Sequence, residues 1–279
     1  MIIATNIGEL QTSLRFFDKH LGFVPTMGAL HQGHLELVRQ SKTLNLPTVM
    51  SIFVNPTQFG PHEDLEKYPR PFENDCALAR QEGVDVLFAP PIDQMYTTPS
   101  WLSVRESHLS SVLCGQYRPG HFDGVCLIVL KLLQLVRPSH LFMGQKDGQQ
   151  LRIIERMCEE LFLPTHVVGV PTVRESDGLA MSSRNQYLHP DQREIAPKLY
   201  QALQAAKRAF EDGERDARTL INSVHQNLDG IPGMELQYVD LLRWEDFQFS
   251  QTIQKKSILA LAAFLGKTRL IDNILLETS

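Results

Sequence analysis

The sequence predicts an α/β fold, in which a parallel β-sheet domain is followed by a smaller α+β domain. In the first two thirds of the chain, short apolar runs alternate with segments of helical pattern. This alternation is typical of a parallel sheet covered by helices on both faces. After about residue 176 the order changes to two helical segments and then three strand-like runs. We therefore predict domains at residues 1–175 and 176–279.

The expected strands of the first domain are short apolar runs that end at turn residues. One begins at Phe23, and the others cover residues 49–54, 84–89, 140–143 and 166–170. The expected helices have apolar residues at helical spacing, and they cover residues 35–39, 72–81, 124–136 and 149–161. Ligands of such sheets bind at the carboxyl ends of the strands. Polar segments follow three strands there, at residues 25–34, 55–59 and 144–150.

The second domain is expected to contain two helices and three strands. The helical patterns cover residues 190–211 and 217–228. The strand-like runs cover residues 235–242, 257–264 and 269–276. The Gly266-Lys267-Thr268 turn is expected to join the last two strands as a hairpin.

Composition excludes several classes of protein. The chain has 279 residues, of which 43% are hydrophobic, so it can fill a sizeable core. Its net charge of −5 argues against a nucleic-acid partner. The four cysteines have no paired spacing, which indicates reduced thiols in a cytoplasmic protein. The N-terminus lacks the pattern of a signal peptide, and the apolar stretches are too short to span a membrane.

The most informative segment, residues 23–34, passes from a strand through a Gly-containing turn to a helix that begins with two histidines. Free backbone N–H groups and the helix dipole make such a turn an anion site. His31 and His34 lie three positions apart, on one face of the first helical turn. The segment therefore indicates a polyphosphate site, although it matches neither the Walker nor the dinucleotide fingerprint. A histidine-bound metal and a pair of structural histidines are the alternatives.

Two further segments carry cations next to small or hydroxylated residues. Lys146 follows a strand and lies between Gly144 and Gly148, where its charge can meet a phosphate. The alternative is a surface lysine beside Asp147. The segment of residues 177–185 offers two serine hydroxyls and Arg184, which can bind phosphate oxygens, or it is a helix cap and linker.

Neutral amides occur at two of the polar segments. Gln58 and Gln150 suit a hydroxylated substrate better than a second nucleotide. Asn55-Pro56 by itself is typical of an ordinary turn. The loop of residues 118–122 has cationic potential, and a structural turn explains it equally well.

Several of these segments together resemble the pantothenate synthetase (pantoate–β-alanine ligase) family, within the wider His-x-Gly-His nucleotidyl-transfer superfamily. They occur in the family's order and extend over essentially the whole chain. The matching segments are residues 25–34, 52–59, 118–122, 144–147, 181–185 and 269–273. Any one of them is weak evidence, but the first five in register are highly specific, and the resemblance extends to the sixth near the C-terminus.

The resemblance implies an ATP-dependent ligase that works in two half-reactions. Pantoate attacks the α-phosphorus of Mg-ATP to give pantoyl adenylate and pyrophosphate. The amine of β-alanine then attacks the acyl carbon to give pantothenate and AMP. The family pattern also implies a homodimer with a Rossmann-like N-terminal domain and a C-terminal lid, and no organic prosthetic group. A lid is useful because an adenylate hydrolyses easily in water.

The resemblance also assigns residues to each substrate. ATP is expected to be bound by Met27, Gly28, Ala29, Leu30, His31, Gln32, Gly33, His34, Gly144, Gln145, Lys146, Asp147, Val173, Met181, Ser182, Ser183 and Arg184. The expected catalytic residues among them are His34, His31, Lys146 and Arg184. Val173 is expected to lie against the adenine. Gln58 and Gln150 are expected to bind pantoate, with Gln58 also close to β-alanine. The ligands of Mg²⁺ are not assigned.

Two positions depart from the family pattern. Cys114 occupies the place of an acidic residue, and Gly148 that of a larger side chain.

Two other functions compete with the ligase. A nucleotidylyltransferase would share the His-x-Gly-His helix start. Its phosphorylated acceptor would call for more Arg and Lys side chains, whereas Gln58 and Gln150 offer neutral amides. A regulatory nucleotide-binding module would have no need of the intact cationic residues.

Overall fold

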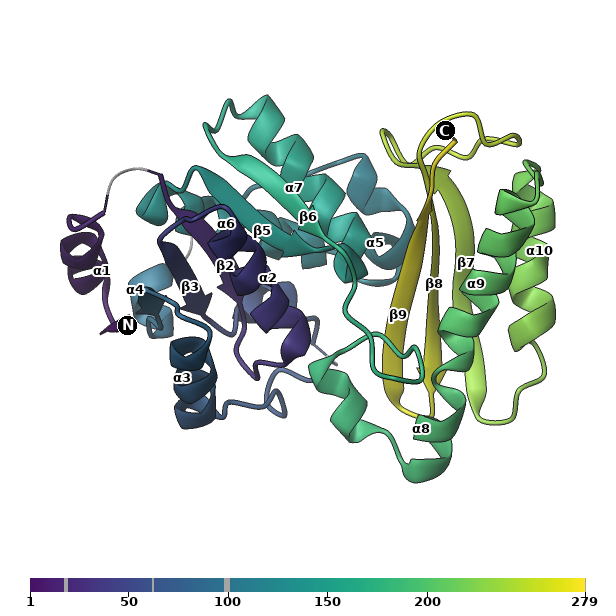
Figure 1. Ribbon diagram of the computed structural model, residues 1–279, viewed down its shortest axis with the longest axis horizontal. Coiled ribbons are helices and arrows are strands. Elements are labelled where there is room, and N and C mark those ends of the chain that lie inside the picture. The colour runs from purple at the N-terminus through teal and green to yellow at the C-terminus, as the bar shows by residue number, and fades with distance from the viewer. Residues whose placement is uncertain (18–19, 62, 98–100, 279) are drawn as a thin grey trace. The chain divides into compact units, whose positions relative to one another are not determined.

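A computed structural model describes residues 1–17, 20–61, 63–97 and 101–278, and the chain divides into two compact units (Figure 1). The first unit contains Met1–Ser107, Arg118–Gly144 and Ile153–Pro171. The second contains His108–Tyr117, Gln145–Arg152 and Thr172–Ser279. Two segments from the first 175 residues therefore cluster with the C-terminal part of the chain.

The first unit is built on a six-stranded sheet with the order β1-β4-β3-β2-β5-β6, in which every pairing is parallel. The strands are β1 (Ile2–Ala4), β2 (Gly22–Thr26), β3 (Thr48–Ile52), β4 (Val86–Phe88), β5 (His140–Gly144) and β6 (His166–Val170). The predicted parallel sheet is thus confirmed. The short edge strand β1 was not predicted.

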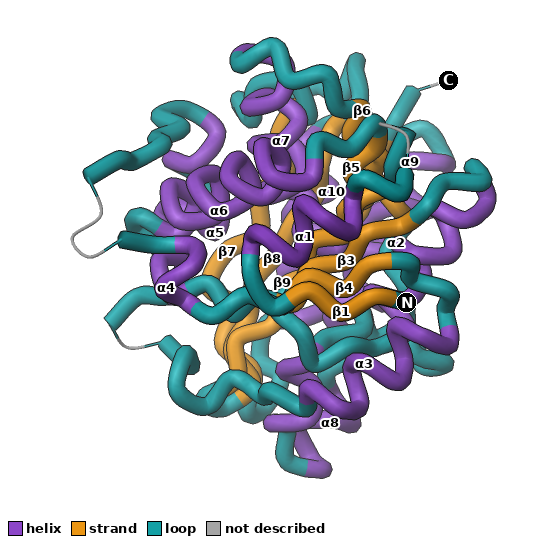
Figure 2. The backbone as a smooth tube through the Cα atoms, turned by 90° about the vertical axis from the view of Figure 1, so that its left-hand side faces the viewer, coloured by secondary structure: helices purple, strands orange, loops and turns teal. Residues whose placement is uncertain are grey.

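Helices cover both faces of this sheet (Figure 2). The helices that contribute to the first unit are α1 (Ile7–Leu14), α2 (Gln32–Thr43), α3 (Phe72–Gln81), α4 (Ile92–Met95), α6 (His121–Val136) and α7 (Gly148–Glu160), with the 3₁₀ helix η1 (Pro56–Gln58). On one face, the apolar sides of α2 and α3 pack on alternate strand residues such as Val24, Met50 and Leu87. On the other face lie α1 and α6.

The second unit places two helices against an antiparallel sheet of three strands in the order β7-β8-β9. Its elements are η2 (Leu109–Ser111), α5 (Leu113–Tyr117), η3 (Gln145–Asp147), the first turn of α7, η4 (Ser183–Tyr187), α8 (Pro190–Ile195), α9 (Lys198–Glu211), α10 (Ala217–Leu228), β7 (Met234–Arg243), β8 (Ser257–Leu265) and β9 (Thr268–Leu276). Buried apolar residues of α9 and α10 form its core with residues of the sheet. The predicted hairpin joins β8 and β9.

One predicted helix is wrong in its extent. Residues 190–211 form two helices, α8 and α9, because Pro197 interrupts the pattern. A proline inside a helix has no N–H to donate and its ring meets the preceding turn. In addition, α6 begins three residues before the expected Gly124, directly after Gly120, whose φ of +80° is left-handed.

The four cysteines are free and buried. Within the described part of the chain, no helix combines the length and the apolar character needed to cross a membrane.

Candidate functional site

In the first unit, the two histidines lie at the start of α2, directly after the turn that leaves the carboxyl end of β2. Their rings are stacked, with centroids 4.0 Å apart and planes inclined by 27°. Both side chains are partly exposed. Across residues 1–17, 20–61, 63–97 and 101–278, no three His, Cys, Asp or Glu side chains are grouped as a metal ion would require. The paired imidazoles thus lie at the end of the sheet where ligands of such folds bind.

The backbone of this turn is held by a buried carboxylate. Asp75, on the first turn of α3, accepts hydrogen bonds from the N–H groups of Ala29 and Leu30, each at 2.8 Å. Gly28 has a φ of +81°, and a Cβ there would lie 2.9 Å from Oδ2 of Asp75. Its own N–H donates to Oγ1 of Thr26 at 3.2 Å. The close approach of Asp75 therefore requires glycine at position 28.

These contacts correct one expectation. The turn and the helix start were expected to offer free backbone N–H groups to a phosphate, and for residues 28–30 this expectation is wrong, because their N–H groups already donate within the protein. The reason is that a buried N–H must find an acceptor even in the absence of a ligand. The histidine side chains are consequently the groups of this turn that are best suited to contact phosphate.

His31 also has a structural function, as one alternative had anticipated. It is the N-cap residue of α2, and its Nδ1 accepts a hydrogen bond from the N–H of Gly33 at 3.1 Å. A neutral imidazole that accepts at Nδ1 carries its proton on Nε2. The cap therefore fixes the tautomer in which Nε2 of His31 is a donor. Gln32, by contrast, accepts from Arg39 along the exposed side of α2.

Gln58 lies next to the same turn, at the end of η1. Its Nε2 donates to Sδ of Met27 at 2.8 Å, and its Oε1 accepts from Nδ2 of Asn55 at 3.1 Å. Asn55 is 1% exposed, and its Oδ1 accepts from the hydroxyl of Tyr96 at 2.7 Å. A thioether is a weak acceptor. The N–H of Gln58 can therefore exchange Met27 for a stronger acceptor at little cost.

The loop of residues 118–122 serves a structural purpose in the first unit. Arg118 forms two hydrogen bonds with the carboxylate of Glu63, each at 2.6 Å. Burial by itself would raise the pKa of Glu63, but the hydrogen bonds and charge of Arg118 outweigh it and lower that pKa. His121 donates from Nδ1 to the carbonyl of Gln58 at 2.8 Å. This loop thus supports the backbone at Gln58.

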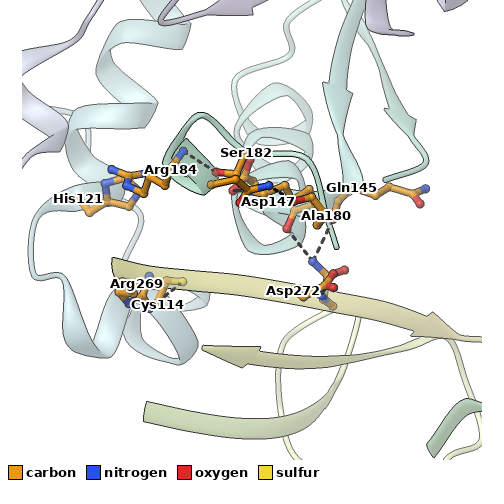
Figure 3. Close-up of polar contacts among 12 residues, drawn as sticks. Cys114, His121, Gln145, Asp147, Ala180, Ser182, Arg184, Arg269 and Asp272 are labelled. Carbon is orange, nitrogen blue, oxygen red and sulfur yellow. Dashed lines mark hydrogen bonds and ion pairs between the residues drawn. The ribbon is translucent and has the colours of Figure 1, made fainter. Parts of the chain in front are cut away.

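In the second unit, Lys146 lies on the short turn η3. Its Nζ is 3.4 Å from Oδ1 of Asp147, and 21% of its side chain is exposed. The carbonyls of Gln145 and Lys146 both accept from Nδ2 of Asn273. Figure 3 shows these contacts beside the strand that carries Asp272. The loose contact with Asp147 leaves the charge of Lys146 available to an anion.

A small hairpin brings two of the predicted ATP residues together. The N–H of Met181 donates to the carbonyl of Val173 at 3.0 Å, and Arg174 pairs with Ala180 as an antiparallel bridge. Gly178, with a φ of +95°, lies in the turn between them. Val173, which is expected to lie against the adenine, and Met181, which begins the segment expected to close over the phosphates, are therefore neighbours.

Of the two serines that follow this hairpin, Ser182 has a capping function. Ser182 is the N-cap of η4, and its Oγ accepts from the N–H of Arg184 at 3.2 Å. The amide of Asn185 donates to Glu175 and to the carbonyl of Ala180, so η4 is fixed to the hairpin. The helix-cap interpretation of Ser182 is thus correct, and it does not conflict with a role for the half-buried Arg184.

Neighbouring glutamines at the start of α7 have different surroundings. Gln149 is 5% exposed, donates to the carbonyls of Leu109 and Val112, and accepts from the N–H of Cys114. Gln150 is half-buried, and its side-chain amide has no hydrogen bond to the described residues. Gln149 is therefore structural, whereas Gln150 has both its donors and its acceptor available for a substrate.

The two departures from the family pattern also lie in the second unit. Sγ of Cys114 is 3.4 Å from Nη2 of Arg269 and 3.2 Å from the hydroxyl of Tyr238. Burial raises the pKa of Tyr238, so its hydroxyl remains protonated. A Cβ at Gly148 would lie 2.8 Å from Cδ1 of Ile258 and 3.2 Å from Oδ1 of Asn273. Cys114 thus gives Arg269 a weaker acceptor than a carboxylate, and a larger residue at position 148 would require the side chains of Ile258 and Asn273 to shift.

Sequence patterns did not reveal Asp75 as part of these arrangements, and they placed Asn55 and Asp272 in matching segments without identifying their partners. Asp75 is 45 and 46 residues from its partners, so local spacing does not connect it with them. The only signal was a carboxylate in a position that also fits the apolar face of the helix, next to Cys76.

We expect Asp75→Asn to lower the rate of ATP-dependent pyrophosphate release about tenfold. The side-chain amide of asparagine can accept from only one of the two N–H groups that Asp75 holds. The protein should therefore also be destabilised by about 1–3 kcal/mol. Burial raises the pKa of Asp75. The hydrogen bonds that its carboxylate accepts from the N–H groups of Leu30 and Ala29 oppose this shift but do not outweigh it. The folded state then binds the proton more tightly than the unfolded state. The contribution of Asp75 to the free energy of unfolding therefore falls as pH rises from its ordinary pKa to the raised one.

Urea unfolding of the wild type and Asp75→Asn, compared at pH values from about 4 to 7, measures this slope. The difference in unfolding free energy should change at the acid end and be constant near neutrality. A constant difference over the whole range, together with wild-type activity, would contradict the assignment.

Comparison with other proteins shows that this chain is similar to one family over nearly its whole length. The family model described as Pantoate-beta-alanine ligase matches residues 2–275. The protein named pantothenate synthetase from Thermotoga neapolitana is 48% identical over 268 residues, which cover 96% of each chain. The crystal structure of pantothenate synthetase from Thermus thermophilus has a TM-score of 0.94 at 40% identity, covering 98% of this chain and 99% of that one.

A third relative was crystallised with ligands. It is the pantoate-beta-alanine ligase from Francisella tularensis in complex with beta-gamma ATP and beta-alanine. Its TM-score is 0.82 at 36% identity, covering 100% of this chain and 99% of that one.

Proposed function

Because this chain belongs to the pantoate–β-alanine ligase family, we propose that it condenses pantoate with β-alanine at the expense of ATP, by way of pantoyl adenylate, and releases pyrophosphate and AMP. The observation that carries this proposal is the match over residues 2–275, which includes every residue assigned above to ATP or pantoate. The full-length relatives are named for the same ligation.

In the first half-reaction, the carboxylate of pantoate attacks the α-phosphorus of Mg-ATP, and the bond to the β-phosphate oxygen breaks. Negative charge develops on the α-phosphoryl oxygens and on the departing pyrophosphate. We assign hydrogen-bond donation to His34 and to Nε2 of His31. Lys146 and Arg184 neutralise the charge on the phosphates. None of these residues forms a covalent intermediate.

In the second half-reaction, the amine of β-alanine attacks the acyl carbon of the adenylate. A C–N bond forms, the bond from the acyl carbon to the phosphate oxygen breaks, and AMP leaves. We assign Gln58 to both substrates. Its N–H exchanges the weak acceptor Sδ of Met27 for an oxygen of pantoate. Gln150, whose amide is available, is the second pantoate residue.

Three finer assignments belong to the same proposal. Mg²⁺ enters as Mg-ATP, since this ion is usually bound by substrate phosphates and one or two carboxylates. The protein acts as a homodimer in the cytoplasm, as the family pattern implies. The assignment of the second unit as a lid over the reacting groups stays a prediction.

Pyrophosphate release with ATP and different acids tests the function. The ligase releases pyrophosphate when pantoate is present and forms pantothenate and AMP when β-alanine is added. A nucleotidylyltransferase would require a phosphorylated acceptor. A regulatory nucleotide-binding module would release nothing with any acid.

We expect Gln58→Ala and Gln150→Ala to raise the KM for pantoate about tenfold, with little change in the KM for ATP, because each loss leaves a substrate hydroxyl or carboxylate unpaired at about 1–3 kcal/mol. Gln58→Ala should also slow amide formation from preformed adenylate. Steady-state kinetics with each substrate varied in turn measures both effects.

Gln149→Ala is the matched control for this pair. It removes the buried contacts to residues 109–114, so it should lower thermal stability and leave the KM for pantoate of the folded enzyme unchanged. An ATP defect without a pantoate defect in the Gln58 and Gln150 variants would overturn the assignment of the pocket.

A further inference from the structure

Strand β9 carries two consecutive polar side chains that are almost completely buried. Asp272 is 3% exposed and Asn273 is 8% exposed. Successive side chains of a strand point to opposite faces, so these two residues contact different segments of the second unit. A buried polar group is costly unless it is hydrogen-bonded, and the partners of this pair are therefore informative.

Asn273 holds the turn that carries Lys146. Its Nδ2 donates to the carbonyl of Gln145 at 3.0 Å and to that of Lys146 at 2.8 Å. Both N–H bonds of one amide are thus used on two consecutive carbonyls. The turn η3 spans three residues, and such a short 3₁₀ segment has poor hydrogen-bond geometry of its own. Asn273 consequently fixes the backbone from which the Lys146 side chain extends.

Asp272 holds the hairpin of residues 173–181. Its carboxylate accepts two hydrogen bonds from the guanidinium of Arg174, at 2.6 and 2.9 Å. The guanidinium also stacks on the ring of Tyr200, 3.4 Å from its centroid. A bidentate and stacked arginine has little freedom to move. Through Arg174, Asp272 therefore fixes the hairpin that pairs Val173 with Met181.

We propose that Asp272 and Asn273 are positioning residues for the ligase reaction, and that from adjacent places on β9 they set the Lys146 turn and the 173–181 hairpin independently. This inference rests on the proposed function for the roles of the two segments. Neither residue is assigned to contact ATP. Oδ1 of Asp272 also accepts from the backbone N–H of Asn273 at 2.8 Å, a bond that uses neither side-chain N–H of Asn273.

The two residues should differ in the half-reaction that they affect. Lys146 is assigned to phosphates that leave as pyrophosphate, and pantoyl adenylate lacks them. Val173 is assigned to the adenine, which pantoyl adenylate retains. Loss of the Asn273 contacts should therefore impair adenylation alone. Loss of the Asp272 contacts should weaken the binding of both ATP and pantoyl adenylate.

The test uses two substitutions that nearly conserve shape. Asn273→Asp replaces the two N–H donors by an oxygen that faces two carbonyls, and we expect adenylation to fall about tenfold. Amide formation from synthetic pantoyl adenylate should stay within about twofold of the wild-type rate. Asp272→Asn should raise the KM values for ATP and for pantoyl adenylate about tenfold each.

The matched control is Asn227→Asp, on the exposed side of α10, where the amide donates to the carbonyl of Ser223 at 2.7 Å. It should behave as the wild type in every assay. If Asn273→Asp does not fold, Asn273→Ser, which keeps one donor, should show the same selective loss of adenylation to a smaller degree.

If Asp272 and Asn273 had a purely structural role, their substitution would lower the rates of both half-reactions in proportion to the fraction of unfolded enzyme and would leave each KM unchanged. This result would overturn the inference. Wild-type adenylation by the folded Asn273 variant would also overturn it. If the wild type released no pyrophosphate with pantoate, the proposed function would fail instead. Calorimetric titration with ATP would then still test the positioning roles, since both variants should bind ATP more weakly than Asn227→Asp.

Discussion

His34→Ala is expected to abolish most adenylation while the protein stays folded. His34 lies on the first turn of α2 with its ring stacked on that of His31, and alanine is a good helix former at an internal position. The imidazole is assigned to donate to phosphate oxygens whose charge grows as the reaction proceeds. Loss of one such donor costs roughly 2–4 kcal/mol, or about 10²–10³ in rate.

Single-turnover release of pyrophosphate measures this loss, with ATP binding measured in parallel. His166→Ala is a suitable control, because His166 is exposed and begins β6, at the amino ends of the parallel strands, whereas the turn with His34 follows the carboxyl end of β2. Pyrophosphate release by His34→Ala at a rate near that of the control would refute the assignment.

Lys146→Ala is expected to slow adenylation about 10²-fold and to slow amide formation much less. The cation stabilises pyrophosphate as it leaves, and no pyrophosphate forms in the second half-reaction. The structure supports this selectivity, because the charge of Lys146 is only loosely paired with Asp147 at 3.4 Å. An ammonium held tightly by a carboxylate would be less able to respond to the arriving phosphates.

The measurement supplies synthetic pantoyl adenylate and β-alanine directly and compares this rate with that of the full reaction. Lys207→Ala serves as a control, since Lys207 is half-exposed on α9 and pairs with Glu211. An equally steep fall of both half-reactions in Lys146→Ala would show that the phosphate role is wrong or incomplete.

Hydrophobic periodicity predicted the helices and strands of this fold well where turn or capping residues mark both ends of a segment. The limits of α3, α10 and β6 agree with the sequence pattern to the residue, because each has turn or capping residues at its ends. The pattern failed where one residue overrides it, as Pro197 does between α8 and α9. It also failed at β1, whose three residues are too few to show an alternation.

Sequence motifs identified the segments that carry the candidate site residues, but they did not identify the distant residues that hold these segments in place. The pairs Asp75 with Leu30 and Asn273 with Lys146 join residues far apart in the chain, at 2.8 Å each. Such contacts depend on tertiary structure, and local spacing carries no information about them. The same limit explains the error over the backbone N–H groups of the turn after β2. The sequence could indicate that these groups need an acceptor, but not that Asp75 supplies it.

The cap formed by His31 restricts which residues can meet both demands of that position. A residue there must first accept a hydrogen bond from the N–H of Gly33 so that α2 can begin. Asparagine or aspartate would satisfy this demand but would remove the donor assigned to phosphate. Lysine would restore a donor but has no acceptor. Histidine meets both demands with one ring, and only in its neutral form, because protonation of Nδ1 would remove the acceptor. We therefore expect His31→Asn to keep the cap of α2 and to remove the donor assigned to phosphate, which would separate the role of residue 31 in folding from its proposed role in the chemistry.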